Sequence, residues 1–132
     1  MRAHLVLLVA GCGSSPTGSH CTTDSNCGTE VCARDGECLP ASQVRMVKLT
    51  WTIRGSAANP TSCASSPNFY VQFDSSDLND SFGYEPVPCQ QGQFGVDKLP
   101  KRYVQAEIGV DQSLLDAQAI DATGMASFDL SP

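Results

Sequence analysis

The chain has 132 residues and a formal net charge of -6, and charged residues make up only 17% of it. This length allows one domain, or one domain with a small satellite. An acidic chain with scattered Lys and Arg lacks the basic patch that nucleic acid requires, so we expect no nucleic-acid partner. No apolar stretch approaches the roughly 18 residues of a membrane-spanning helix, so we expect any membrane attachment to be covalent or peripheral.

Residues 1–11 have the layout of a secretory signal peptide. Arg2 supplies a positive charge, a short apolar run follows, and small residues precede Cys12. The stretch "VAGC" resembles a bacterial lipobox. That resemblance implies cleavage before Cys12, acylation of its thiol and attachment to a membrane, where each buried methylene contributes about 0.8 kcal/mol. The alternative is a buried first strand in which Cys12 is a structural thiol.

The seven cysteines divide unequally along the chain. Once Cys12 is assigned to lipid, six remain, and an even number in an exported chain predicts three disulfides. They are Cys21, Cys27, Cys32, Cys38, Cys63 and Cys89. Among the three possible pairings of the first four, we expect the interleaved one, Cys21 with Cys32 and Cys27 with Cys38.

We call residues 21–40 the knot, because crosslinks must replace a core there. Val31 is almost its only large apolar residue, and each disulfide contributes about 2–4 kcal/mol. Zinc binding with His20 is the competing interpretation, but the segment has no C-x2-C pair, and we expect no metal. Its acidic residues are expected to be solvated surface charges.

Residues 44–131 alternate between apolar and polar side chains, which predicts half-buried strands. The strongest patterns are "VKLTWTIRG", "NFYVQFD" and "RYVQAEIGV"; shorter ones are "QFGV" and "ASFDL". The segment "LLDAQAI" also suits a short helix, but the turn signal at 121–124 that follows it favours a strand. The prolines of "SFGYEPV" confine that strand to an edge. About seven short strands separated by turn residues predict an antiparallel β-sandwich, so the fold class is all-β.

Particular residues are assigned to the two faces of these strands. In "RYVQAEIGV" the inward residues are expected to begin at Val104. The expected core residues are Trp51, Phe69, Phe73, Phe94, Ile108 and Phe128. A disulfide between Cys63 and Cys89 would tie two loops at one end of the sandwich. On the outer faces we expect Tyr70, Gln72, Tyr84 and Tyr103, which are ordinary strand residues or, less simply, contacts for a sugar or a peptide.

The sequence shows no catalytic set. His4 lies in the leader and His20 before the knot, so no histidine-assisted nucleophile is available to the sandwich. We therefore expect no enzymatic activity and no cofactor. The acidic loop 74–80 is expected to be a solvated turn. The alternative from another class is a calcium-dependent carbohydrate binder or a small hydrolase that uses this loop.

The whole layout resembles a group of small lipoproteins of the myxobacterial type, which carry a lipobox, a short Cys-rich knot and a sandwich like the transthyretin or carboxypeptidase-regulatory domain. The passages behind the resemblance are "GCGSS", "CTTDSNCGTEVC", "VKLTWTIRG" and "PCQQGQFGVDKLPKRYVQAEI". In the last of these, Lys101 and Arg102 stand where the group usually has a glycine. The resemblance implies an architecture and a cellular address, and no particular activity.

The predicted organisation is a signal peptide at 1–11, a lipid-anchored linker at 12–20, the knot at 21–40 and the sandwich at 44–131. We expect a cell-envelope protein held at a membrane by Cys12, acting as a non-enzymatic binding or structural module with a possible protein or glycan partner. Gly13, in place of the Asp that retains lipoproteins at the inner membrane of enteric bacteria, favours the outer membrane. An unacylated secreted protein is the remaining alternative.

Overall fold

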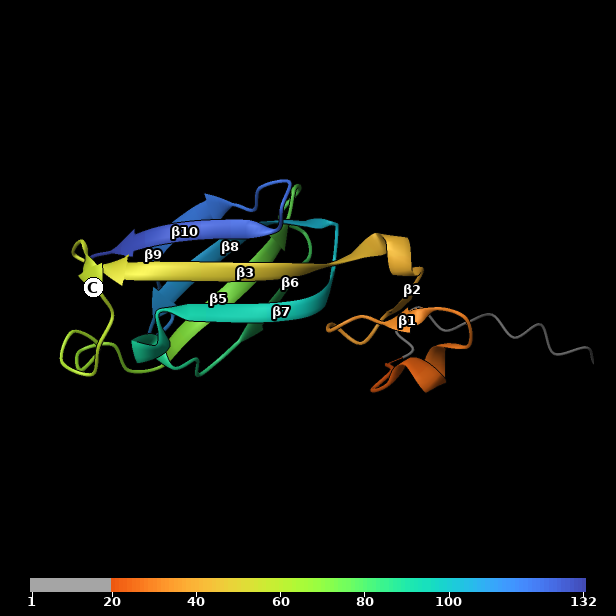
Figure 1. The fold of residues 1–132 in the computed structure, drawn as a ribbon, viewed down its shortest axis with the longest axis horizontal. Coiled ribbons are helices and arrows are strands. Elements are labelled where there is room, and N and C mark those ends of the chain that lie inside the picture. The colour runs from red at the N-terminus through yellow and green to blue at the C-terminus, as the bar shows by residue number, and fades with distance from the viewer. Residues whose placement is uncertain (1–19) are drawn as a thin grey trace, which may run out of the picture.

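The computed structural model describes residues 20–132, which form an all-β fold in two parts. Figure 1 shows a small, loop-rich knot beside one end of a two-layered sandwich. The knot contains a 3-10 turn, η1 (Asp24–Cys27), and two very short antiparallel strands, β1 (Val31–Cys32) and β2 (Cys38–Leu39). A second 3-10 turn, η2 (Ala41–Gln43), then leads directly into the sandwich.

Two sheets of similar size make up the sandwich. The first contains β3 (Val44–Ile53), β4 (Ser56–Ala57), β7 (Gln93–Pro100) and β10 (Met125–Leu130), with β3 paired to the other three. The second has the order β6 (Ser81–Tyr84), β5 (Phe69–Ser75), β8 (Tyr103–Val110) and β9 (Ser113–Ala119). The pairs are antiparallel, as predicted, except that β10 runs parallel to β3.

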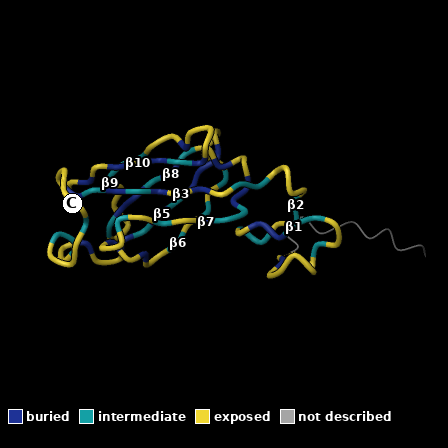
Figure 2. Tube along the Cα trace, viewed as in Figure 1, coloured by how far each residue is buried: buried dark blue, intermediate teal, exposed yellow. Residues whose placement is uncertain are grey.

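The period of two in the sequence becomes a buried apolar layer between the sheets, visible as the dark segments of the strands in Figure 2. Along β3 the alternate residues from Val47 to Ile53 are all buried, as predicted. The Trp51 ring packs on Phe69 with centroids 5.1 Å apart, and its indole Nε1 donates to the carbonyl oxygen of Cys89 at 2.8 Å. Trp51 therefore satisfies its one donor inside the core.

The three disulfides of the structure are Cys21–Cys32, Cys27–Cys38 and Cys63–Cys89. The first two interleave within the knot, as expected. The third joins the loop before β5 to the short turn η3 (Cys89–Gln91) after β6. All six cysteines predicted to be crosslinked are thus paired, and Cys12 lies outside the described residues.

The prediction for β8 was wrong at its first residues. Val104 is 40% exposed, whereas Tyr103 is 1% exposed and lies among the core residues rather than on the outer face. The cause is a β-bulge. Asp74 pairs with Gln105 and the next residue of β5, Ser75, pairs with Tyr103, so Val104 is an extra residue on β8. A bulge of one residue reverses which face the following side chains occupy.

Phe94 also departs from its prediction as a core residue, because it is only partly buried. It lies on β7, an edge strand of the first sheet, and its ring contacts Tyr84 of the edge strand β6 at a centroid distance of 5.0 Å. The position of β6 at a sheet edge agrees with the two prolines that follow it. The Phe94 and Tyr84 rings thus lie between the edge strands of the two sheets and stay partly exposed.

Candidate functional site

The contact between the knot and the sandwich is built around Arg102, which precedes β8. Its Nη1 lies 2.8 Å from Glu37 Oε2 and its Nε lies 2.6 Å from Asp80 Oδ2, while Nη2 donates to Asp35. The Asp35 side chain is only 9% exposed. Two of these carboxylates come from the knot and one from the loop after β5. The prediction that the acidic residues of the knot are solvated is therefore wrong for Asp35.

Tyr103, the residue after Arg102, adds its hydroxyl and its ring to this cluster. Its hydroxyl lies 3.3 Å from Asp35 Oδ2 and 3.2 Å from Asp80 Oδ1, and the Arg102 guanidinium lies 4.9 Å from the centroid of its ring. Burial raises the pKa of Tyr103, and the neighbouring carboxylates add to the effect. Burial lowers the pKa of Arg102, but Asp80 and Asp35 outweigh it and the net shift is upward. Arg102 therefore stays a cation and Tyr103 a hydrogen-bond donor.

Two further ion pairs flank Arg102. Lys98 Nζ lies 2.8 Å from Asp24 Oδ1, and Arg34 Nε lies 2.6 Å from Asp97 Oδ1. The hydrogen bond from Lys98 lowers the pKa of Asp24, and that from Arg34 lowers the pKa of Asp97. The backbone N–H of Arg34 also donates to the Lys98 carbonyl oxygen at 3.1 Å. The knot is therefore joined to the sandwich by complementary charges and a main-chain hydrogen bond.

A second bulge lies in the pairing of β3 with β7, on the sandwich side of the contact with the knot. Arg45 pairs with Leu99 and Val47 pairs with Val96, so two residues of β7 face the single residue Met46 of β3. One of the two is Lys98, which has a positive φ of 51°. Bulges redirect side chains at the ends of strands. Both sandwich bulges beside the β7–β8 turn thus occur where the knot is attached.

The acidic loop 74–80 does not gather its carboxylates around one point. Asp77 Oδ1 accepts from the Ser75 hydroxyl at 2.7 Å and from the Asn79 N–H at 3.1 Å, which lowers the pKa of Asp77. Asp80 faces Arg102. These contacts stabilise a turn and the knot contact, and they provide no support for the calcium-dependent alternative.

Asp74, the first residue of this loop, interacts with Glu107 of β8 rather than with a cation. It is buried on β5; its Oδ1 accepts from Gln72 Nε2 at 2.9 Å, and its Oδ2 has no hydrogen-bond partner. Burial raises the pKa of Glu107 on the adjacent strand β8, and the charge of Asp74 raises it further. The Glu107 carboxyl group therefore holds a proton more readily than a free glutamate.

Among residues 20–132, a compact group with metal-ligand atoms consists of Cys21, Cys27 and Cys32. All three are in disulfides, so they cannot act as thiolate ligands.

The tyrosines predicted on the outer faces have different surroundings. Tyr70 pairs with Gly109, and its ring lies where a Cβ of residue 109 would be, so it covers the bare backbone of β8. Burial raises the pKa of Tyr70 and of Tyr84. The outer-face prediction was wrong for Tyr84, because it pairs with the buried Val71 and packs against the core. Its ring meets Phe82 edge-on and lies tilted against Phe94 at the sandwich edge. These rings do not form one continuous platform.

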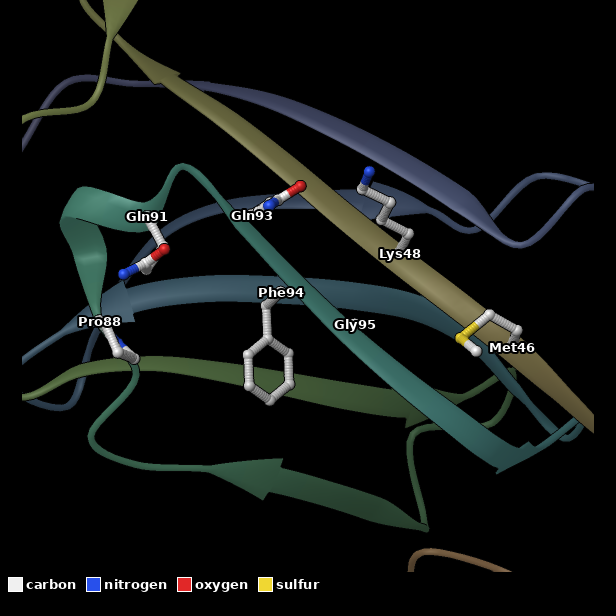
Figure 3. Close-up of a pocket in the computed structure, with 7 residues that line it drawn as sticks. All are labelled: Met46, Lys48, Pro88, Gln91, Gln93, Phe94 and Gly95. Carbon is white, nitrogen blue, oxygen red and sulfur yellow. The ribbon is translucent and has the colours of Figure 1, made fainter.

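A hollow of about 480 Å³ lies over β3 and β7, close to that edge. Figure 3 shows Lys48 and Met46 on β3, with Gln93 on β7 and the ring of Phe94 on the far side of that strand. Gly95 forms part of the floor, because it carries no side chain there. Most of the lining is apolar, and the polar groups are one ammonium and amides.

A second hollow of about 610 Å³ adjoins the first through Met46. Its lining includes Arg45, Lys101, Val104 and Thr123. The guanidinium of Arg45 donates to the carbonyl oxygens of Asp121 at 3.1 Å and Tyr103 at 3.2 Å, and its Nε has no partner. Neither hollow is predictable from the sequence, because their linings come from strands and turns far apart in the chain.

No known protein family model, no curated protein and no solved structure matches this chain. Within residues 20–132, no helix has the length and apolar character that crossing a membrane requires.

Proposed function

We propose that the chain is a lipid-anchored protein of the cell envelope, attached through Cys12, and that its knot and sandwich act as a non-enzymatic binding or structural module. The observation that carries the proposal is the pairing of the cysteines. Six of the seven form three disulfides, which indicate an extracytoplasmic protein. The remaining cysteine is the one that follows the signal-like leader.

The described residues support a module rather than a catalyst. The charged groups at the knot contact are held in ion pairs, and the carboxylates of loop 74–80 are turned toward separate partners. A general acid or base needs to face a substrate with a suitable pKa. The hollow over β3 and β7 offers contact surface whose polar groups are one ammonium and amides.

Fractionation of the native host tests the anchor. After a high-salt wash, the wild-type protein is expected in the membrane fraction, and the Cys12→Ser variant is expected in the soluble fraction. The salt removes proteins that adhere by charge alone. A wild-type protein released by salt, or a Cys12→Ser variant that stays in the membrane fraction, would contradict the proposal and favour an unacylated protein.

A calcium titration tests the alternative that uses loop 74–80. A site that binds only the folded chain raises its melting temperature by mass action. We expect no shift with calcium, and a shift abolished by Asp77→Asn would favour the carbohydrate-binding alternative.

A further inference from the structure

The two adjoining hollows collect most of the cations that lie outside ion pairs in residues 20–132. Residues 20–132 contain seven Lys and Arg, the eight of the whole chain less Arg2. In this part of the chain, Arg34, Lys98 and Arg102 form ion pairs with carboxylates. The four cations outside these pairs are Arg45, Lys48, Arg54 and Lys101. All of these except Arg54 line the hollows.

The same place exposes apolar side chains. Met46 is 62% exposed and Val104 is 40% exposed, and both line the second hollow. We call Arg45, Met46, Lys48, Lys101 and Val104 the Met46 surface. The acidic residue of its lining, Asp121, accepts hydrogen bonds from Thr123 and from the Met125 N–H. The surface therefore combines projecting apolar groups with three cations around them.

The position of this surface in the fold suggests its partner. Lys101 lies in the turn between β7 and β8, next to Arg102, which holds the knot. The chain enters the described part at residue 20, just before the knot. If Cys12 carries the anchor, seven residues lie between it and residue 20, and the eight steps from one Cα atom to the next span at most about 29 Å. A bilayer that holds Cys12 is therefore within reach of this end of the sandwich.

We propose that the Met46 surface rests on a bilayer containing anionic phospholipids. This inference builds on the proposed lipid anchor and adds the orientation of the protein on the membrane. The Met46 and Val104 side chains enter the interfacial region and the Lys48 and Lys101 ammonium groups lie among the phosphates, while Arg45 adds positive charge without leaving the two backbone carbonyl groups that it holds. Long cationic side chains suit this role, because their stems cover apolar surface while their charges stay in water.

Vesicle flotation of the full chain carrying Cys12→Ser tests the surface without the anchor. We expect it to bind vesicles of phosphatidylcholine with phosphatidylglycerol, and to bind vesicles of phosphatidylcholine alone much less. Each of Lys48→Gln and Lys101→Gln should weaken binding to the anionic vesicles about fivefold, the usual contribution of one cation near such a surface. Arg45 is left unchanged, because it also holds two backbone carbonyl groups.

The chain offers matched controls for both kinds of group. Arg54→Gln removes the same charge just beyond the opposite end of β3, where the guanidinium donates to the carbonyl oxygen of Pro132 at 3.0 Å, and should leave binding unchanged. Met46→Ser should weaken binding, whereas Leu78→Ser, at a residue 66% exposed in the acidic loop, should not.

Three results with vesicles would overturn the proposal: equal binding to both kinds of vesicle, absence of binding to either, or a loss with Arg54→Gln as large as that with Lys101→Gln. Binding of polyglutamate that depends on the same lysines, without binding to vesicles, would also overturn it in favour of an acidic protein partner. None of these results concerns acylation, which the fractionation of wild type and Cys12→Ser tests separately.

Discussion

The knot and the sandwich are stabilised in opposite ways. The knot buries Cys21, Cys32 and Ala33 and relies on two disulfides, whereas the sandwich buries eighteen residues in one cluster and has one disulfide. Small segments that cannot bury enough apolar surface depend on crosslinks, and larger ones do not. The knot also uses polar side chains as scaffolding; for example, Asp24 accepts from the Cys32 N–H at 2.8 Å. The difference predicts that the two parts respond to different perturbations.

The largest expected effect is the loss of the knot on reduction. Its two disulfides contribute about 4–8 kcal/mol together, and too little apolar surface remains to replace them. Hydrogen exchange followed by mass spectrometry should show that residues 21–40 lose protection in reductant while β3, β5 and β8 keep theirs. The double variant Cys63→Ala, Cys89→Ala is the control and should leave the knot protected. A reduced chain with a protected knot would contradict this difference between the two parts.

A cavity in the sandwich is expected to destabilise the sandwich, which depends on its buried apolar layer rather than on crosslinks. Phe73 is fully buried between the sheets, and Phe73→Ala should lower the free energy of unfolding by about 3–5 kcal/mol. Chemical denaturation followed by Trp51 fluorescence measures the change. Leu114→Ala, at a residue 54% exposed on β9, should change stability by less than about 0.5 kcal/mol. Equal losses in the two variants would show that the buried layer is not the main source of stability.

The contact between the two parts is expected to be weaker than either part. Arg102→Gln removes the cation shared by Asp35, Glu37 and Asp80 and should cost about 1–3 kcal/mol, because the Asp35 carboxylate is largely buried. Arg34→Gln, at a side chain 45% exposed, should cost less than about 1 kcal/mol. Thermal unfolding measures both. The contact is not centred on Arg102 if the Arg34 variant is the less stable of the two.

The smallest effect concerns Glu107 and depends on pH. Burial and Asp74 raise the pKa of Glu107 above its ordinary value of 4.5. Above that value the folded chain holds a proton that the unfolded chain has released, so stability falls as the pH rises through this window.

Glu107→Gln removes this titration. It should make the protein more stable than the wild type at neutral pH by about 0.5 kcal/mol, and the difference should shrink below the ordinary pKa of a glutamate. Denaturation series at several pH values measure it, with Glu85→Gln at an exposed position as the control. A difference that does not vary with pH would assign the gain to packing instead.

The sequence was sufficient to predict what depends on local pattern. Alternating apolar residues predict the strands around Trp51 and Phe73, and cysteine spacing predicts the crosslinked knot. It was insufficient where a single extra residue changes a register, as at Val104, because a bulge is visible only once the partner strand is known.

Long-range charge pairs were also unpredictable. Arg102 meets Asp35 across 67 positions of sequence, and neither residue carries a local signal that identifies the other. The same holds for the Met46 surface, whose cations come from β3 and from the β7–β8 turn. Arg102 stands in a short turn whose sequence does not identify the knot as its partner, and its role is visible only in the folded chain.

The most direct test of the proposed function is the intact mass of the native protein from a membrane fraction of its host, measured before and after reduction and alkylation. We expect a chain that begins at Cys12, heavier by two or three acyl groups, with six further thiols that react only after reduction. A chain without acyl groups, or with thiols of the knot that react without reductant, would contradict the proposal.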